Sequence, residues 1–336
     1  MRENGFTVRF YRESDDESLV GLLQAVYGRW PAQTTAAAPI DHLRWKLRSH
    51  PDAVRWHVVA EAGGELAGSR LFWLQRVRVG GRLLLARQGV DIGVHPRYQG
   101  RGMMTAMRNF AREASAAAFD VELHMGSTRS HPALVRMRSH EAEPPPFGNQ
   151  VTLLGLRVQR SAQDEPVSEQ RWSVGETRAF DERIDAFCEE ALRRFEFAMM
   201  RDRDYLTWRY CDAAAGPYIV KLAEQAGGVL GYLVLRVTDG RAYVADLLAL
   251  PERGDVAASL VAAAIAEAQR AGAERIDCWL PSRHVYRPLL EEFGFKQRSV
   301  REAMAFGPLR TPLGGLAPLL DPNAPIHLTM GDTDLV

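Results

Sequence analysis

The stretch of the sequence most suited to chemistry runs from Val90 to Phe110, VDIGVHPRYQGRGMMTAMRNF. An apolar strand is expected to end at Val94, a glycine-bearing turn follows, and a helix is expected to begin near Gly102. Such a strand–turn–helix directs several backbone N–H groups and the positive end of the helix dipole to one point, which favours an anion. Two glycines allow close approach of the main chain and two arginines add positive charge: Gly100, Gly102, Arg97 and Arg101.

Taken alone, a Gly-x-Gly turn is equally compatible with a tight strand–helix connection that binds nothing. Two common nucleotide-binding patterns do not fit this sequence. It has no GxxxxGK[ST] run, and no GxGxxG run followed by an acidic residue about 20 positions later. The stretch therefore belongs to neither of these types.

The sequence also contains an internal repeat. Asp41-His-Leu-Arg-Trp-Lys46 recurs as Asp204-Tyr-Leu-Thr-Trp-Arg209, and Asp91-Ile-Gly-Val-His-Pro96 matches Asp246-Leu-Leu-Ala-Leu-Pro251. Between these matches, each copy has two apolar runs joined by Gly-Gly, a pattern typical of a β-hairpin. The shared order predicts two copies of one structural unit.

Each copy is expected to continue into an Ala-rich helix, at about 102–118 and 255–271, and then into another strand, at about 119–125 and 274–280. Strands that alternate with helices in both halves predict the mixed α/β (α+β) class.

The boundary between the copies is expected in the run RSAQDEPVSEQ, which has no apolar periodicity and is typical of a linker. We therefore predict an N-terminal domain at residues 1–158, a linker at 159–171, a C-terminal domain at 172–310 and a C-terminal tail at 311–336. The length of 336 residues also fits two domains, each able to bury a core of its own.

Charge argues against a general nucleic-acid partner, because 42 Lys and Arg residues balance 42 Asp and Glu residues. The N-terminus is charged where a signal peptide would be apolar, and the most apolar run, at 256–266, is too short to span a bilayer. Cys188, Cys211 and Cys278 lie far apart, which argues against a zinc site or a disulfide framework. We expect a cytoplasmic protein without a membrane partner or a metal.

The stretch Val94-His-Pro-Arg-Tyr-Gln-Gly-Arg-Gly102 resembles the acyl-CoA pyrophosphate loop of the GCN5-related N-acetyltransferases (GNAT), whose core pattern is Gln/Arg-x-x-Gly-x-Gly/Ala. Gln99 and Gly102 match this pattern, and Met104 stands where Gly or Ala is usual. The order of elements is also similar, over about 6–160 and more faintly over 170–305. The whole chain resembles a tandem member of the family, with two GNAT-like units, each a mixed, mostly antiparallel sheet flanked by helices.

The resemblance implies where acetyl-CoA would bind as acyl donor. The pantetheine arm would follow the strand that ends at Val94, whose main chain would bind the thioester carbonyl, and the pyrophosphate would lie on residues 99–104. The second copy has LPERGDV at 250–256, whose single glycine and two acidic residues predict a poor phosphate site. We therefore place the cofactor in the N-terminal copy, on Ile92, Gly93, Val94, Arg97, Gln99, Gly100, Arg101, Gly102, Met103, Met104 and Thr105.

Acyl transfer to an amine needs a group that takes the amine proton. Asp91 is one candidate, although Asp246 repeats it in the second copy and favours a shared structural role. His124 and His131 lie where the family lines its acceptor site, and the alternative for each is a structural histidine. Where the family often has a strand glutamate, this sequence has Gln88.

Further catalytic candidates come from the C-terminal half. Tyr286 lies in the region of the tyrosine that protonates the thiolate in the family, and the alternative is a packed aromatic residue. Tandem members can return their C-termini toward the first cleft, which makes Asp332 and Asp334 candidates as base or as anchor for a cationic acceptor. The alternative is a solvated, frayed end.

Together these features predict an acetyl-CoA-dependent N-acyltransferase that acts on a primary amine of a small molecule, such as an amino sugar, an aminoglycoside-like compound or a natural-product amine. Direct attack in a ternary complex is expected, because no cysteine lies near the loop to form an acyl-enzyme. A monomer or a homodimer is expected. The alternatives are a non-catalytic acyl-CoA-binding or scaffold protein, a protein acceptor, and a longer acyl donor.

Overall fold

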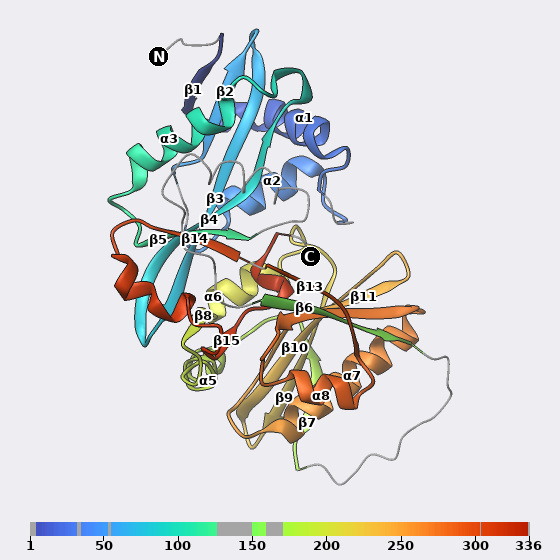
Figure 1. Cartoon of the computed structure of the whole chain (residues 1–336). Coiled ribbons are helices and arrows are strands. Elements are labelled where there is room, and N and C mark those ends of the chain that lie inside the picture. The colour runs from blue at the N-terminus through green and yellow to red at the C-terminus, as the bar shows by residue number, and fades with distance from the viewer. Residues whose placement is uncertain are drawn as a thin grey trace. The chain divides into compact units, whose positions relative to one another are not determined.

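The computed structural model describes residues 5–31, 35–52, 55–125, 150–158, 171–302 and 304–334. The chain divides into two compact units (Figure 1). Unit 1 comprises residues 1–147 and 303–320, and unit 2 comprises residues 148–302 and 321–336.

The described residues of unit 1 form one sheet and three main helices. Its elements are β1 (Thr7–Phe10), α1 (Asp16–Tyr27), α2 (Pro39–Arg48), β2 (Val58–Ala62), β3 (Glu65–Val79), β4 (Arg82–Val94), α3 (Met103–Ser115), β5 (Val121–Met125) and β14 (Met304–Pro308). The strands are ordered β1-β2-β3-β4-β5-β14, and only β4 and β5 are parallel neighbours.

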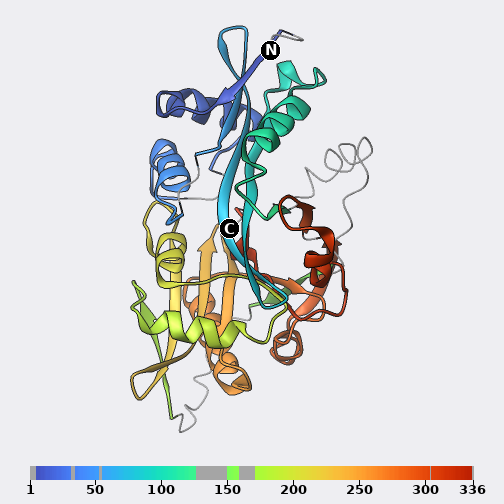
Figure 2. The ribbon, with the colours of Figure 1, turned by 90° about the vertical axis from the view of Figure 1, so that its left-hand side faces the viewer.

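Helices cover both faces of the unit 1 sheet, with α1 and α2 on one face and α3 on the other (Figures 1 and 2). Successive side chains of β3 point to opposite faces of the sheet, so this strand contacts the helices on both faces. Phe72 packs in the core beneath α3 with Met103 and Met107, whereas Trp73 on the opposite face donates from Nε1 to the carbonyl of Lys46 in α2 at 3.2 Å. The sheet is therefore buried on both sides at its centre.

Unit 2 has a similar plan. Its elements are β6 (Gln150–Arg157), β7 (Ser173–Thr177), α5 (Arg183–Leu192), β8 (Phe197–Met199), α6 (Arg203–Leu206), β9 (Tyr218–Gln225), β10 (Gly228–Thr238), β11 (Arg241–Ala249), α7 (Gly254–Arg270), β12 (Arg275–Pro281), α8 (Arg287–Glu292), β13 (Lys296–Glu302) and β15 (Ile326–His327). The sheet order is β13-β6-β12-β11-β10-β9-β7, and only β11 and β12 are parallel neighbours within it. The mixed α/β class with two mostly antiparallel sheets flanked by helices is confirmed.

The two expected β-hairpins are present. β2 and β3 are joined at Gly63-Gly64, and β9 and β10 at Ala226-Gly227, with positive φ at all four turn residues. A two-residue turn of this kind matches the right-handed twist of the strands that it joins. The helices and strands predicted after the hairpins are α3, α7, β5 and β12.

The compact units differ from the domain ranges expected from the sequence. β6, expected in the first domain, pairs with β12 and β13 in unit 2, whereas β14, expected in the second, pairs with β5 in unit 1. The expected tail is divided as well, since Leu320 closes unit 1 and Asp321 returns the chain to unit 2. An alternating strand can complete the edge of either sheet, so its pattern does not specify its partner.

Candidate functional site

The candidate site lies in unit 1, at the loop between β4 and α3. Pro96–Tyr98 forms a short 3₁₀ turn after β4, and the His95 side chain accepts a hydrogen bond from the backbone N–H of Arg97 at 3.2 Å. Gly100 and Gly102 follow with φ of +79° and +78°, and a Cβ at either position would meet no atom within 4 Å. Glycine is required here for the left-handed backbone, and the space outside both residues is open.

The N-terminus of α3 has no side-chain cap. Gly102 occupies the N-cap position, and the first turn contains no acidic residue. The N–H groups of this turn have no partner within the helix, and the positive end of the helix dipole lies beside them. The Gln99 side chain ties the loop to the strand, because its Nε2 donates to the carbonyl of Val94 at 3.1 Å.

Two arginines of the loop lie at its surface. Arg101 lies over the ring of Tyr98, with 5.2 Å between the guanidinium carbon and the ring centre, and donates to the carbonyl of Arg97 at 3.3 Å. The Arg97 side chain is largely exposed, and its Nη1 lies 3.8 Å from Oε1 of Glu65. Uncapped N–H groups, open glycines and nearby arginines together form a cradle for an anionic group.

Packing beneath α3 holds this cradle in place. A Cβ on Gly68 of β3 would come within 2.9 Å of Met107 Cε and 3.0 Å of Met103 Sδ, so the helix lies directly on the strand. Met104 is partly buried against the same core, and Thr105 is exposed. The Met104 side chain thus packs against this core, while its backbone remains in the first turn of α3.

Within the residues that the structure describes, the ladder between β4 and β5 is short. Their pairing runs from Ala86 opposite Val121 to Gly89 opposite His124, and β4 then continues to Val94. Beyond the last pair, the Tyr27 hydroxyl donates to the carbonyl of Ile92 at 2.9 Å. Gly93 packs against α1, since a Cβ there would lie 2.6 Å from Val26 Cγ1. The helix α1 therefore supports the part of β4 that lies beyond its last described pair with β5.

Asp91 lies in a bulge of β4 with φ of +44°. Its carboxylate is buried toward α1 and α2, where Oδ2 is 2.6 Å from Lys46 Nζ and Oδ1 accepts from Trp30 Nε1 at 2.9 Å. The Ser69 hydroxyl donates to its carbonyl at 2.9 Å. Through these contacts the Asp91 carboxylate stabilises the bulge. They favour a structural role for Asp91 over the role of a catalytic base.

His124 faces the other side of the sheet, in a cluster that the sequence analysis did not identify. Its Nε2 is 3.4 Å from Oε1 of Glu122, which lies two residues earlier on the same face of β5. Burial alone would raise the pKa of Glu122, but the charges of Arg70, His124 and Arg87 outweigh it and hold the pKa below its usual range. The glutamate is therefore ionised inside the unit.

Arg70 and Arg87 hold this carboxylate from two neighbouring strands. Arg70 donates to Oε1 of Glu122, and Arg87 donates to Oε2 at 2.8 Å. Arg87 also donates to the carbonyl of Ala111 in α3 at 2.9 Å and to the Ser115 hydroxyl. Charged residues at alternate positions of otherwise apolar strands were the signal in the sequence that would have revealed the cluster.

Comparisons with known proteins identify the region. Residues 7–130 match the family model described as "Acetyltransferase (GNAT) domain". The chain contains a GNAT acetyltransferase domain. This assignment supports acyl transfer, and the GNAT family generally uses acetyl-CoA. No curated protein matches the sequence.

Solved structures share the fold over nearly the whole chain. A "Probable N-Acyltransferase" from Enterococcus faecalis V583 aligns with 11% identity and a TM-score of 0.67, over 93% of this chain and 74% of the other. A GCN5-related N-acetyltransferase from Anabaena variabilis aligns with 12% identity and a TM-score of 0.63, over 90% and 73%. One from Sphaerobacter thermophilus aligns with 18% identity and a TM-score of 0.56, over 92% and 98%. The GNAT-like fold therefore extends beyond the residues that the family model matches.

In unit 2, the place that corresponds to the end of β4 in the GNAT domain is filled by a side chain. Gly68 pairs with Val94 in unit 1, and Gly231 pairs with Ala249 in unit 2, so Ala249 corresponds to Val94. The hydroxyl of Tyr286 accepts from the N–H of Ala249 at 2.7 Å and is also bonded to Arg194 at 2.7 Å. Burial raises the pKa of Tyr286. The tyrosine is a packed residue of unit 2.

The C-terminal segment packs against β11 and β12 of unit 2, beyond the point where these two strands stop pairing. β11 and β12 stop pairing after Tyr243 and Asp277, and β15 and the turn at 330–332 contact the strands beyond that point. Asp332 is buried against Arg201, at 2.9 Å, and Arg201 Nε also donates to Asp246 at 2.7 Å. Asp332 is therefore part of the core of unit 2.

The structure says little about the two remaining catalytic candidates. Asp334 lies at the end of the described residues and is partly buried. His131 lies outside the described residues. Among the residues that the structure covers, no helix combines the length and apolar character needed to cross a membrane.

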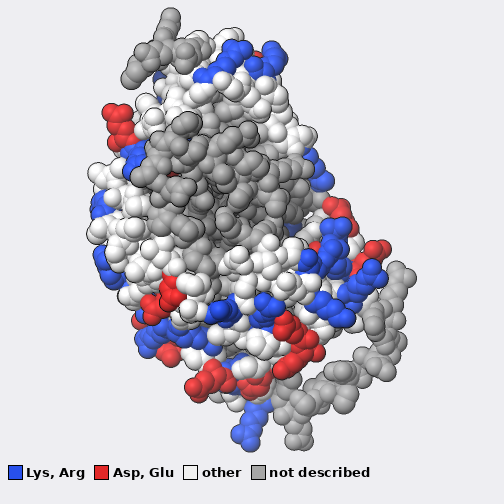
Figure 3. Space-filling model, viewed as in Figure 1, with Lys and Arg blue, Asp and Glu red and all other residues white. Residues whose placement is uncertain are grey.

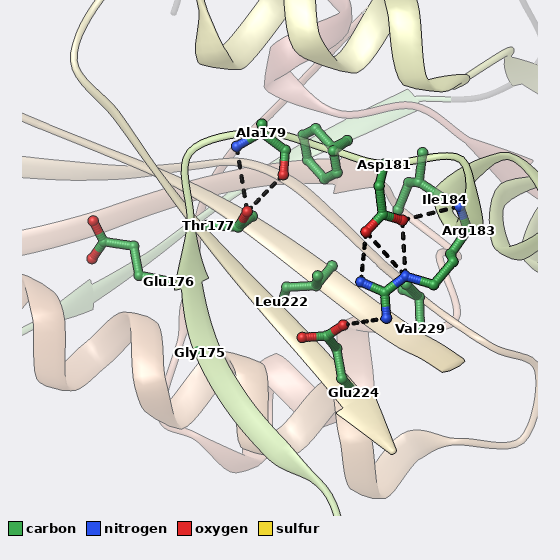
Figure 4. Close-up of a pocket in the computed structure, with 11 residues that line it drawn as sticks. Gly175, Glu176, Thr177, Ala179, Asp181, Arg183, Ile184, Leu222, Glu224 and Val229 are labelled. Carbon is green, nitrogen blue, oxygen red and sulfur yellow. Dashed lines mark hydrogen bonds and ion pairs between the residues drawn. The ribbon is translucent and has the colours of Figure 1, made fainter. Parts of the chain in front are cut away.

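A small pocket of about 150 Å³ lies elsewhere in unit 2, lined by β7, the start of α5 and residues of β9 and β10 (Figure 4). Arg183 is paired there with Asp181 at 2.6 Å and with Glu224 at 2.8 Å, so its charge is already neutralised. On the described part of the face in Figure 3, basic and acidic side chains are interspersed. Neither feature offers a strongly charged site comparable to the loop before α3.

Proposed function

We propose that the protein is an acetyl-CoA-dependent N-acyltransferase that acts on a primary amine of a small molecule by direct attack in a ternary complex. The observation that carries the proposal is the N-terminus of α3, which has no side-chain cap and follows two left-handed glycines in the loop after β4. The pyrophosphate would lie on residues 99–104, and the pantetheine would follow β4 toward the loop. The GNAT assignment supports the transfer chemistry.

Each part of the acyl donor has a suitable partner in this arrangement. Backbone N–H groups and a helix dipole stabilise a pyrophosphate, and Arg97 and Arg101 add charge at the surface. The main chain of β4 continues beyond its last described pair with β5, and backbone groups there can hydrogen-bond to an amide-bearing arm. The thioester would then lie near Val94, within the same unit as His124.

The direct test is calorimetric titration of acetyl-CoA into the wild type and the Gly102→Glu variant, with free CoA as a comparison. A carboxylate at the phosphate position should weaken binding by roughly 100-fold or more, because it repels the pyrophosphate and blocks the helix end. Gly272→Glu is the matched control, since Gly272 also has positive φ, of +70°, and open space outside it. This control variant should bind as the wild type does.

Turnover separates an enzyme from a non-catalytic acyl-CoA-binding protein. A panel of amino sugars, aminoglycosides and simple primary amines would be incubated with acetyl-CoA, and release of free thiol would be followed. Thiol release that depends on the amine and is lost in Gly102→Glu supports the proposal. Absence of acetyl-CoA binding by the wild type would contradict it.

A further inference from the structure

The charged cluster around Glu122 occupies positions that are apolar in unit 2. The ladders align Arg70 with Leu233 and Arg87 with Ala242, and they align Glu122 with Ile276. Two residues further along each strand, His124 corresponds to Cys278. All four unit 2 residues are buried members of its hydrophobic core: Leu233, Ala242, Ile276 and Cys278. The fold can therefore be built without charges at these places.

The cluster is also costly to bury. Two arginines surround a single carboxylate, and Arg70 and Arg87 are each about 1% exposed or less. Within the described part of the chain, the Nε atoms of both arginines have no hydrogen-bond partner. Buried ion pairs are weak contributors to stability compared with a packed apolar core. The stability of the unit therefore does not explain why these three charged residues are buried. An effect on a neighbouring side chain explains it better.

His124 is that neighbour. It stands at the last described pair of β5 with β4, opposite Gly89. Its side chain is 18% exposed, whereas that of Glu122 is 9% exposed. The ring lies beside Gly89, where a Cβ would be 3.6 Å from Nδ1. The histidine is therefore partly exposed, whereas the carboxylate beside it is buried and fixed by two arginines.

We propose that His124 is the proton acceptor of the acyl transfer and that Glu122, clamped by Arg70 and Arg87, is its positioning residue. This inference rests on the proposed function. The amine nitrogen forms the new C–N bond to the thioester carbon, and its proton passes to the imidazole. The C–S bond breaks, CoA leaves as the thiolate, and the thiolate takes up the proton from the imidazolium. The carboxylate orients the ring and stabilises the imidazolium that forms.

The charges around His124 have opposing effects on its protonation. Glu122 on β5 lies 3.4 Å from the ring, where a carboxylate favours the imidazolium, whereas the guanidinium groups of Arg70 on β3 and Arg87 on β4, which bind the same carboxylate, oppose it. The residue of β14 in register with His124 is Ala305, which is uncharged. Removal of one charge of each sign should therefore shift the titration of His124 in opposite directions.

The test combines three measurements on the full chain, for the wild type, His124→Asn, Glu122→Gln and Arg70→Leu. Acetyl-CoA binding is measured calorimetrically, the His124 ring is titrated by NMR, and the pH dependence of kcat/KM is recorded with an amine that the wild type acetylates. Arg70→Leu retains the pair between Arg87 and Glu122 and introduces the residue that unit 2 has at this place. Arg70→Leu is therefore expected to fold, so the role of the cluster can be tested even if Glu122→Gln does not fold.

We expect His124→Asn to lower kcat by roughly 100-fold or more while acetyl-CoA binds as before. Glu122→Gln should move the His124 titration and the acid limb of kcat/KM to lower pH by about one unit, and Arg70→Leu should move both to higher pH. Full activity of His124→Asn would overturn the role of the histidine, and an unmoved titration in Arg70→Leu would overturn the role of the cluster. Failure of the wild type to bind acetyl-CoA would instead contradict the proposed function, and the NMR titration would still decide whether the cluster controls His124.

Discussion

The two units have the same order of sheet and helices around a strand–loop–helix, and neither helix has a side-chain cap, but only in unit 1 is the first helical turn free of acidic residues. Before α3 the loop has two left-handed glycines and no acidic residue in the first helical turn. Before α7, Asp255 lies in the first turn, is paired with Arg253 at 2.9 Å, and has its pKa lowered first by that arginine and then by the backbone N–H of Val256. A side-chain carboxylate thus occupies in unit 2 the place where an anionic ligand would bind in unit 1.

The same contrast continues along the neighbouring strands. In unit 1 the last part of β4 is supported from α1, and the charged cluster around Glu122 lies toward α3. In unit 2 the equivalent region is closed by the Tyr286 hydroxyl and by the C-terminal segment. The two units therefore differ in whether this region is closed by side chains of the chain itself.

The largest effect is expected from loss of the cation that anchors the C-terminal segment. Arg201→Met leaves Asp246 and Asp332 buried without their guanidinium partner, which should lower the free energy of unfolding by about 3–5 kcal/mol. Urea unfolding measures the change, and limited proteolysis should show earlier cleavage after Asp321. An unchanged unfolding midpoint would show that the segment does not stabilise unit 2.

A pH effect should follow from the buried histidines of unit 2. His284 Nε2 lies 3.0 Å from His327 Nδ1, and burial is the largest cause that lowers both pKa values below 6.5. Below pH 6.5 the unfolded chain binds protons that the folded chain does not, so stability falls as the pH falls. Each neutral histidine contributes about 1.4 kcal/mol per pH unit to this slope.

The slope can be measured by urea unfolding at several pH values between 7.5 and 5. His284→Phe should reduce the dependence below pH 6.5 and leave it unchanged above pH 7. An identical slope in the variant would mean that His284 titrates normally in the folded state.

A smaller loss is expected for Tyr286→Phe. The variant leaves the N–H of Ala249 without its acceptor, which should cost about 1–2 kcal/mol in thermal or urea unfolding. Because the hydroxyl lies in the filled copy, acetyl-CoA binding and kcat should stay at the wild-type level. A large fall in kcat with intact binding would instead return Tyr286 to the catalytic candidates.

The smallest effect should come from a full apolar exchange of the charged cluster. The triple variant Arg70→Leu, Arg87→Met and Glu122→Leu should have a free energy of unfolding within about 1 kcal/mol of the wild type, because packed apolar side chains replace a buried ion cluster. Glu122→Ala alone should cost about 3–5 kcal/mol, since it leaves two buried arginines unpaired. Similar losses in both variants would show that unit 1, unlike unit 2, requires these charges to fold.

The sequence alone determined the features that depend on neighbours along the chain. The hairpins follow from their turn residues, α3 follows from the spacing of Met103 and Met107, and the open loop follows from Gly100 and Gly102. The repeat was also readable, because each copy preserves the order of its elements. These signals are local, and local backbone preferences act before any distant contact is made.

The tertiary structure decided which partners those elements find. β6 and β14 complete sheets other than those expected, because an alternating pattern does not encode the partner strand. Arg70 reaches Glu122 across 52 residues, and Arg201 reaches Asp332 across 131. A charged residue in a strand shows only that a partner is needed, because a buried charge must be paired, whereas the identity of the partner depends on how the chain folds back.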